Sequence, residues 1–175
     1  MRLGLKALLR ENLDGAKRVA VLGAGSELRG DDRAGLLVAQ KLRNRCKKNG
    51  ACPPFELFYG ATAPENLTGE IKNYRPSHLI LVDAADAGKE PGAIQVISPE
   101  AIVDTSFSTH RMPLKILVDY LRESIDCKVM LIGIQPKTLE YDAPVSPEVR
   151  SSVRRVVAAI EEIVRQMAPP LDQKT

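Results

Sequence analysis

Short apolar runs alternate along the chain with longer segments in which apolar residues recur at helical spacing. Runs of roughly four to eight residues between glycine, proline or polar positions are typical of buried β-strands. We therefore predict strands at Val19–Gly23, Phe55–Tyr59, Leu79–Val82, Ala93–Ile97 and Lys128–Gly133. The Pro91–Gly92 turn precedes the fourth of them, which is expected to lie at an edge of the sheet.

The segments between these runs show the periodicity of amphipathic helices. We predict helices from Asp31 or Asp32 to about Lys48, from Glu65 to Asn73, from Leu114 to Ser124 and from Ser146 to Met167. The last helix has the clearest boundaries, because Ser146 can cap its first turn and Pro147 suits the position after the cap.

Strands that alternate with helices favour a single α/β domain over residues 1–175. We expect a three-layer sandwich with a mostly parallel, twisted sheet of five strands, helices on both faces and one antiparallel edge strand. Leucines at helical spacing predict an N-terminal extension helix within residues 1–17, whereas residues 169–175 are expected to form a loose tail. No shift in composition indicates a linker or a second domain.

Composition and charge exclude several classes of protein. Hydrophobic residues make up 44% and charged residues 27% of the chain, close to the average for soluble globular proteins. The net charge is only +3, aromatic residues are 4% and Trp is absent, which argues against nucleic-acid binding. No apolar stretch reaches the roughly 18 to 20 residues of a membrane span. The first residues also lack the continuous apolar core of a signal peptide. We therefore expect a cytoplasmic protein without membrane insertion.

The three cysteines, Cys46, Cys52 and Cys127, are odd in number and lack the spacing of a metal finger. We interpret all three as free structural thiols, which agrees with a reducing compartment.

Three polar side chains are expected at the carboxyl ends of the predicted strands, where parallel sheets bind their ligands. Asp32 follows the first strand and its glycine-rich loop, Asp83 ends the most apolar strand, and His110 precedes a helix. Two carboxylates and one imidazole suit a divalent ion such as nickel or zinc. Three protein ligands would leave coordination positions open for substrate or water.

The same residues have simpler interpretations, which their spacing alone leaves open. Asp31 and Asp32 could both cap a helix, and Asp83 could anchor a loop through backbone N–H groups. His110 could be an ordinary hydrogen-bonded loop residue. The second histidine, His78, precedes a strand at its amino end, the wrong edge for this site, and is expected to be structural.

A nucleotide-binding domain is disfavoured. Gly23-Ala24-Gly25 is like the opening of a dinucleotide-binding fingerprint, but Leu28 occupies the place of its third glycine. The second strand ends in Tyr59-Gly60 rather than in an acid that would bind ribose hydroxyls. Neither a phosphate-binding P-loop nor a Gly-x-Ser-x-Gly nucleophile elbow is present.

Five motifs, in order along residues 19–165, resemble those of the hydrogenase maturation endopeptidases. The resemblance is greatest to the type that processes the large subunit of formate-hydrogenlyase-type [NiFe]-hydrogenases. The first motif is close to the family pattern G-x-G-N-x-L-x-x-D-D/E-x-x-G. The motifs are Leu22–Gly35, Ala63–Asn66, Val82–Ala84 with Pro91–Gly92, Thr109–Leu114 and Gly133–Pro136.

This resemblance implies an aspartic-type, nickel-dependent endopeptidase whose substrate is the precursor of a [NiFe]-hydrogenase large subunit. Similar enzymes remove a C-terminal extension only after nickel has been inserted. Asp32, Asp83 and His110 would then form both the nickel-recognition site and the catalytic site. The nickel would be carried by the substrate and bound only weakly by the free enzyme. The alternative is a non-catalytic, nickel-sensing accessory module that docks on the same precursor.

The sequence departs from the family pattern at two places. Ser26 replaces the usual asparagine of the glycine loop, and Tyr59–Thr62 replaces the usual acid-Gly-Gly sequence. The loops at residues 60–66 and 105–112 are the candidates for holding the extended C-terminal peptide of the substrate.

Overall fold

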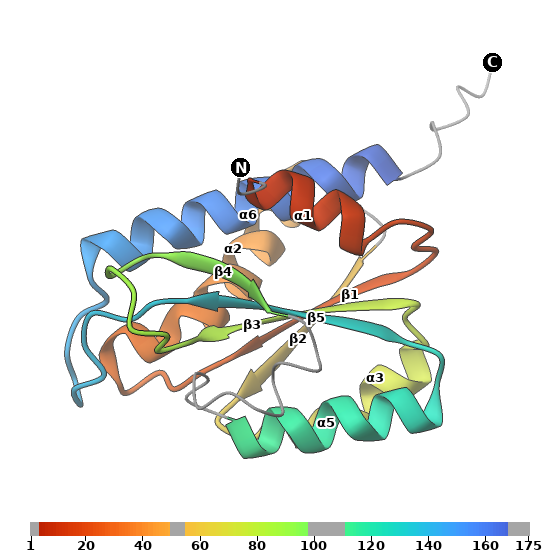
Figure 1. Ribbon diagram of the computed structural model, residues 1–175, viewed down its shortest axis with the longest axis horizontal. Helices are drawn as coiled ribbons and strands as arrows, with labels where there is room; N and C mark the ends of the chain where they lie inside the picture. The colour runs from red at the N-terminus through yellow and green to blue at the C-terminus, as the bar shows by residue number, and fades with distance from the viewer. Residues whose placement is uncertain (1–3, 50–54, 98–110, 168–175) are drawn as a thin grey trace.

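A computed structural model describes residues 4–49, 55–97 and 111–167 of the chain. One sheet lies between two layers of helices (Figure 1). The strands are β1 (Val19–Ala24), β2 (Phe55–Ala61), β3 (His78–Ala84), β4 (Ile94–Ile97) and β5 (Lys128–Ile134). The α-helices are α1 (Leu5–Asn12), α2 (Ala34–Asn49), α3 (Thr68–Tyr74), α5 (Arg111–Ser124) and α6 (Pro147–Met167). Two short 3₁₀ helices are η1 (Gly30–Arg33) and η2 (Pro64–Leu67).

The strand order is β2-β1-β3-β5-β4. The pairs β2-β1, β1-β3 and β3-β5 are parallel, whereas β4 runs antiparallel to β5 at one edge. Both the five-stranded, mostly parallel sheet and its antiparallel edge strand are therefore confirmed.

Each face of the sheet has its own apolar core, because successive side chains of a strand point to opposite faces. Val21, Ile80 and Ile132 belong to the core beneath α1, α2 and α6. Leu79 and Leu131 belong to the core beneath α3 and α5. Burial on both faces explains why these strands appear in the sequence as continuous apolar runs rather than as alternating patterns.

The extension within residues 1–17 does form a helix, and it packs against the rest of the domain. Leu9 and Leu13, in α1 and directly after it, are buried in the core that α6 also covers. On the surface, the Lys6 ammonium lies 2.5 Å from the Glu162 carboxylate of α6. The cap of α6 is also as predicted, since Ser146 Oγ accepts a hydrogen bond from the Val149 N–H at 3.4 Å.

The first turns of two predicted helices are 3₁₀ turns instead. The segment predicted as one helix from Glu65 is divided into η2 and α3. Asp31 and Asp32 lie inside η1, whose cap position is held by Arg29. Neither aspartate therefore occupies a helix cap, and the capping interpretation is wrong. The tighter 3₁₀ turn carries residue types that also suit an α-helical first turn, so the sequence pattern does not separate the two.

The interpretation of three free thiols is wrong for Cys46, which is disulfide-bonded. Among the described residues, Cys127 is free and buried, and desolvation raises the pKa of its thiol to about 12. An odd number of cysteines implies at least one free thiol, but it does not indicate which cysteines form a disulfide. In the described part of the chain, no helix has the length and apolar character needed to cross a membrane.

Candidate active site

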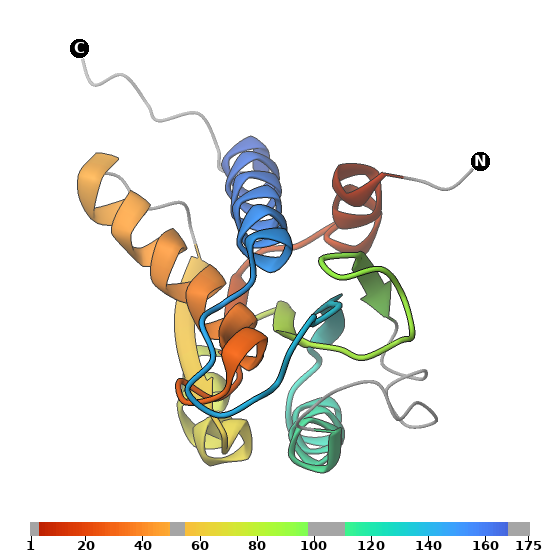
Figure 2. The ribbon, with the colours of Figure 1, turned by 90° about the vertical axis from the view of Figure 1, so that its left-hand side faces the viewer.

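Two buried aspartates lie at the carboxyl edge of the sheet, which faces the viewer in Figure 2. Asp32 comes from η1, and Asp83 is the last residue but one of β3. Their exposed fractions are 2% and 0%. The η1 turn contacts β3, so the structure brings two of the three predicted site residues to one edge of the sheet.

Glycines allow the backbone around η1 to lie in close contact with the ends of β1 and β3. A Cβ atom on Gly35 would lie 2.1 Å from the carbonyl oxygen of Val82, the residue before Asp83. A Cβ atom on Gly25 would lie 1.9 Å from the carbonyl oxygen of Asp32, and the φ of Gly25 is +140°. Side chains at these positions would push η1 away from β1 and β3. The glycines of the first sequence motif therefore set the position of both aspartates.

Backbone N–H groups orient the two carboxylates. The Ser26 N–H donates to Asp32 Oδ2 at 3.1 Å, and the Ala84 N–H donates to Asp83 Oδ1 at 2.8 Å. Ser26 stands where the family pattern has asparagine, but its contact with Asp32 comes from the backbone. Its hydroxyl accepts a hydrogen bond from the Leu28 N–H at 3.3 Å and so shapes the glycine loop. Carboxylates held in this way can bind a cation or accept a proton from water.

Asp31 has a different, structural role that the sequence pattern only partly indicated. Its buried carboxylate accepts hydrogen bonds from the N–H groups of Lys137, Thr138 and Ser146, at 2.8, 3.2 and 2.6 Å. The Ser146 hydroxyl donates a fourth, at 2.9 Å. Asp31 thus fixes the segment between β5 and α6 against η1. No local pattern reveals this contact, because its partners lie more than a hundred residues away in the sequence.

Gln135 fixes a second loop at the same edge. Its side-chain carbonyl accepts hydrogen bonds from the N–H groups of Ala87 and Lys89, at 2.8 and 3.1 Å. Its amide group donates to Asp86 Oδ1 at 2.9 Å. This bond and a second from the Gly88 N–H lower the pKa of the Asp86 carboxyl. The sequence motif Gly133–Pro136 contained Gln135, but gave it no role.

His110, the third predicted site residue, lies outside the described residues, as does most of the candidate peptide-holding loop at residues 105–112. Within the ranges that the structure describes, no three His, Cys, Asp or Glu side chains form a group that could hold a metal ion. The set of Asp32, Asp83 and His110 therefore stays a prediction. His78 starts β3 at the opposite edge, where Ser77 Oγ lies 3.0 Å from its Nδ1.

The chain belongs to the hydrogenase maturation proteases. The family model with that description, HycI, matches residues 37–163. The hydrogenase 3 maturation protease of Escherichia coli is 36% identical over 142 residues, which cover 81% of this chain and 87% of the relative. The hydrogenase 2 maturation protease of the same organism is 29% identical over 156 residues, covering 83% and 92% of the two chains.

Solved structures agree with this assignment. A crystal structure of the [NiFe] hydrogenase maturation protease HycI from Thermococcus kodakarensis superposes with a TM-score of 0.81 at 28% identity, covering 90% of this chain and 99% of that one. The solution structure of the endopeptidase HycI from Escherichia coli gives a TM-score of 0.71 at 34% identity, with 83% and 90% covered. The fold and the family inferred from the sequence motifs are both confirmed.

Proposed function

We propose that this chain removes the C-terminal extension of a [NiFe]-hydrogenase large-subunit precursor after nickel insertion. The observation that carries the proposal is the pair of buried aspartates, Asp32 and Asp83, at one sheet edge of a chain from the maturation protease family. Burial of a carboxylate is costly unless hydrogen bonds or charges compensate it, and backbone N–H groups contact both of these side chains. The neighbouring Asp31 has a structural role instead, since four hydrogen bonds join it to the segment between β5 and α6.

In this proposal, Asp32, Asp83 and His110 recognise a nickel ion that belongs to the substrate. Three protein ligands complete the coordination shell only when the precursor supplies the others, so productive docking depends on the loaded state. Water then attacks the scissile carbonyl carbon, the C–N bond breaks, and the departing amine takes up a proton. Either carboxylate is suited to accept the proton of the water, and the ion is suited to polarise the carbonyl.

The loop at residues 60–66 is proposed to hold the extended peptide together with the loop at residues 105–112. It begins at the end of β2, close to the glycine loop, because the Gly25 N–H donates to the Ala61 carbonyl at 2.9 Å. Ala61 has a φ of +44°, which an alanine adopts only where its surroundings require it.

The cytoplasmic location of the enzyme also remains a prediction.

Incubation with a large-subunit precursor, nickel-loaded and nickel-free in parallel, tests the proposal. Mass spectrometry of the product gives the position of the new C-terminus. We expect cleavage of the loaded precursor only. Binding without cleavage would instead support the non-catalytic accessory module, and equal cleavage of both precursors would contradict nickel recognition.

Substitution of each histidine tests the site within the same assay. His110→Ala should abolish processing and leave the fold intact, as measured by circular dichroism and thermal unfolding. His78→Gln is the matched control, because His78 lies at the amino edge of the sheet, opposite to Asp83. Unchanged cleavage by folded His110→Ala would rule out the proposed site.

A further inference from the structure

Two large apolar side chains are exposed beside the candidate active site. Leu28 is 58% exposed and Tyr141 is 73% exposed, the two highest values among the large hydrophobic residues of the described chain. Leu28 follows the glycine loop after β1, and Tyr141 lies in the segment between β5 and α6. Both segments lie at the carboxyl edge of the sheet, as Asp32 does.

The backbones of these two segments are joined. The Asp142 N–H donates to the Leu28 carbonyl at 2.8 Å, and Arg29 pairs with Tyr141 in an isolated antiparallel bridge. Asp142 has a φ of +56°, so the chain turns sharply directly after Tyr141. We refer to Leu28, Arg29, Tyr141 and Asp142 as the rim.

Hydrogen bonds connect the rim to the two neighbouring aspartates. On one side, the Leu28 N–H donates to Ser26 Oγ, and the Ser26 N–H donates to Asp32 Oδ2. On the other side, Asp31 holds the segment that carries Tyr141 through the N–H groups of Lys137 and Thr138 before it and Ser146 after it. The rim is therefore supported at several points, and a partner that binds it has little backbone entropy to remove.

A single exposed leucine or tyrosine needs no explanation. Here, however, the two are carried by adjoining, well-anchored backbone segments next to the residues that a protein substrate must reach. Exposed aromatic side chains on a rigid support are common anchors of protein recognition, and exposed apolar surface next to them marks interaction sites. Two side chains offer a few hundred Å² at most, well below the roughly 1,000 Å² that a stable interface between two copies of a chain buries. An area of this size is more typical of the transient binding of a substrate than of a stable dimer.

We propose that Leu28 and Tyr141 are the docking anchors for apolar side chains near the C-terminus of the hydrogenase precursor. This inference rests on the proposed function and adds a specificity-determining surface to it. The rim contacts the substrate in its ground state and in its transition state alike, so its contribution is to substrate affinity rather than to the chemical step.

Alanine substitution of the two anchors tests the proposal in the cleavage assay with nickel-loaded precursor. Leu28→Ala and Tyr141→Ala should each raise KM by roughly tenfold with kcat nearly unchanged, as expected for loss of uniform binding. Tyr141→Phe keeps the ring and should behave as wild type. Tyr120→Ala is the matched control, because Tyr120 is 39% exposed on α5 and belongs to no part of the site.

The outcomes separate the two proposals. If the wild-type protein leaves the loaded precursor uncut, the proposed function fails. If the wild type cuts and both alanine variants keep its KM, the rim proposal is wrong and the function stands. Loss of kcat alone, or an equal loss in Tyr141→Phe, would also overturn apolar docking. Self-association of the free protein that both alanine variants abolish would assign the rim to a second copy of the chain instead.

Discussion

The carboxylate of Asp31 accepts four hydrogen bonds at the carboxyl edge of the described structure. Its four donors are three backbone N–H groups and one hydroxyl, all in the segment from Lys137 to Ser146. Asp32, the next residue, faces the glycine loop instead. Adjacent aspartates can thus be separated into a structural one and a candidate catalytic one by the donors that they face.

Asp31→Ala should lower the free energy of unfolding by about 3 kcal/mol, because buried N–H groups lose a charged acceptor. Urea denaturation measures the change. Asp119→Ala is the control, since its carboxylate forms an exposed pair with Lys115 on α5, and such pairs contribute less than about 1 kcal/mol. Equal losses in both variants would show that the Asp31 network does not stabilise the fold.

His78 should make stability depend on pH. Burial is the main cause that lowers the pKa of its imidazole below the usual value of about 6.5. The positive charge of Lys128, which pairs with His78 from the adjacent strand β5, lowers the pKa further, and Asp14 partly opposes this. The unfolded chain then takes up a proton at a higher pH than the folded chain. The contribution of neutral His78 to the free energy of unfolding is complete above about pH 6.5 and is lost as the pH falls below that value.

Urea midpoints at pH 7.5 and pH 5.5, for wild type and for His78→Gln, test this expectation. The wild type should lose more stability between the two values than the variant does. His110 is present in both proteins, so the difference between them reports His78. A steeper loss in the variant would contradict the lowered pKa.

Single residues were predicted from the sequence where a local rule applies to them. Asp83 at the end of an apolar strand and Ser146 before a proline are examples, and both lie where they were expected. The contact between Asp31 and Ser146 spans 115 positions, and no periodicity or cap rule connects residues so far apart. Long-range polar contacts of this kind depend on the loops that the fold brings together.

Among the elements, the first turn after β1 places the strictest demands on the sequence. Gly25 and Gly35 allow η1 to lie against the ends of β1 and β3 without a Cβ atom between the backbones. The sequence identified the glycine-rich loop and the helix after it, but not the 3₁₀ turn between them. A 3₁₀ turn and the first turn of an α-helix accept the same residue types, and only packing decides between them.

Gly25→Ala should destabilise the protein by at least about 2 kcal/mol, since both the positive φ and the contact with the Asp32 carbonyl oppose a side chain. Gly69→Ala, in α3, is the matched control. A Cβ atom there would meet nothing within 4 Å, and alanine favours a helix by up to about 1 kcal/mol over glycine. Thermal unfolding of both variants provides the comparison. A Gly25→Ala protein as stable as wild type would show that η1 can move away from β1 without cost.

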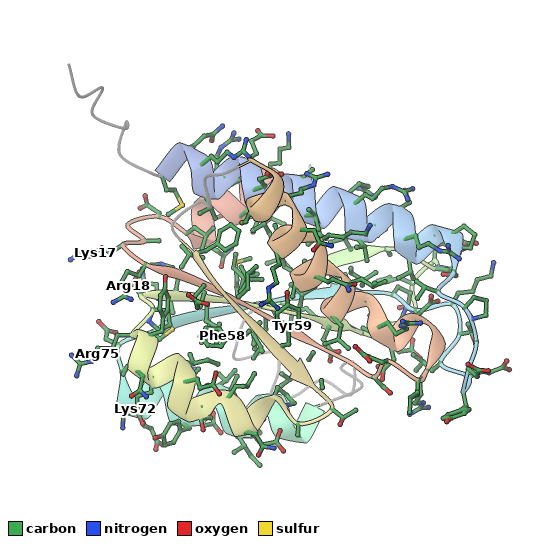
Figure 3. All side chains as sticks on the ribbon, turned by 180° about the vertical axis from the view of Figure 1, so that it is seen from behind. Lys17, Arg18, Phe58, Tyr59, Lys72 and Arg75 are labelled. Carbon is green, nitrogen blue, oxygen red and sulfur yellow. The ribbon has the colours of Figure 1, made fainter. Side chains whose placement is uncertain are left out.

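At the scale of the whole molecule, the position of the candidate site follows from the topology. Strands β1, β3 and β5 are neighbours and parallel, so the segments that leave their carboxyl ends meet at one edge. The opposite edge of the sheet, where these strands begin, carries basic side chains. There Lys17, Arg18, Lys72 and Arg75 gather near the turns before β1 and β3 (Figure 3), and the Arg18 guanidinium lies 4.2 Å from the ring centre of Tyr74.

The sheet and its strand directions could be predicted because both rest on alternation and on general rules for α/β proteins. The shape of the site could not, since it depends on loops of separate origin. Asp31 and Gln135 fix two of them, and neither contact is visible from the order of elements.

The free protein should bind nickel only weakly. Three side-chain ligands at Asp32, Asp83 and His110 would leave the ion partly hydrated, and the remaining ligands come from the precursor in the proposed mechanism. Calorimetric titration with nickel, followed by dialysis and metal analysis, should show that the ion is lost from the wild type. Asp83→Asn is the control that separates this site from adventitious binding. One nickel ion per chain that survives dialysis, and is absent from Asp83→Asn, would identify a resident metal and contradict recognition of a nickel ion carried by the substrate.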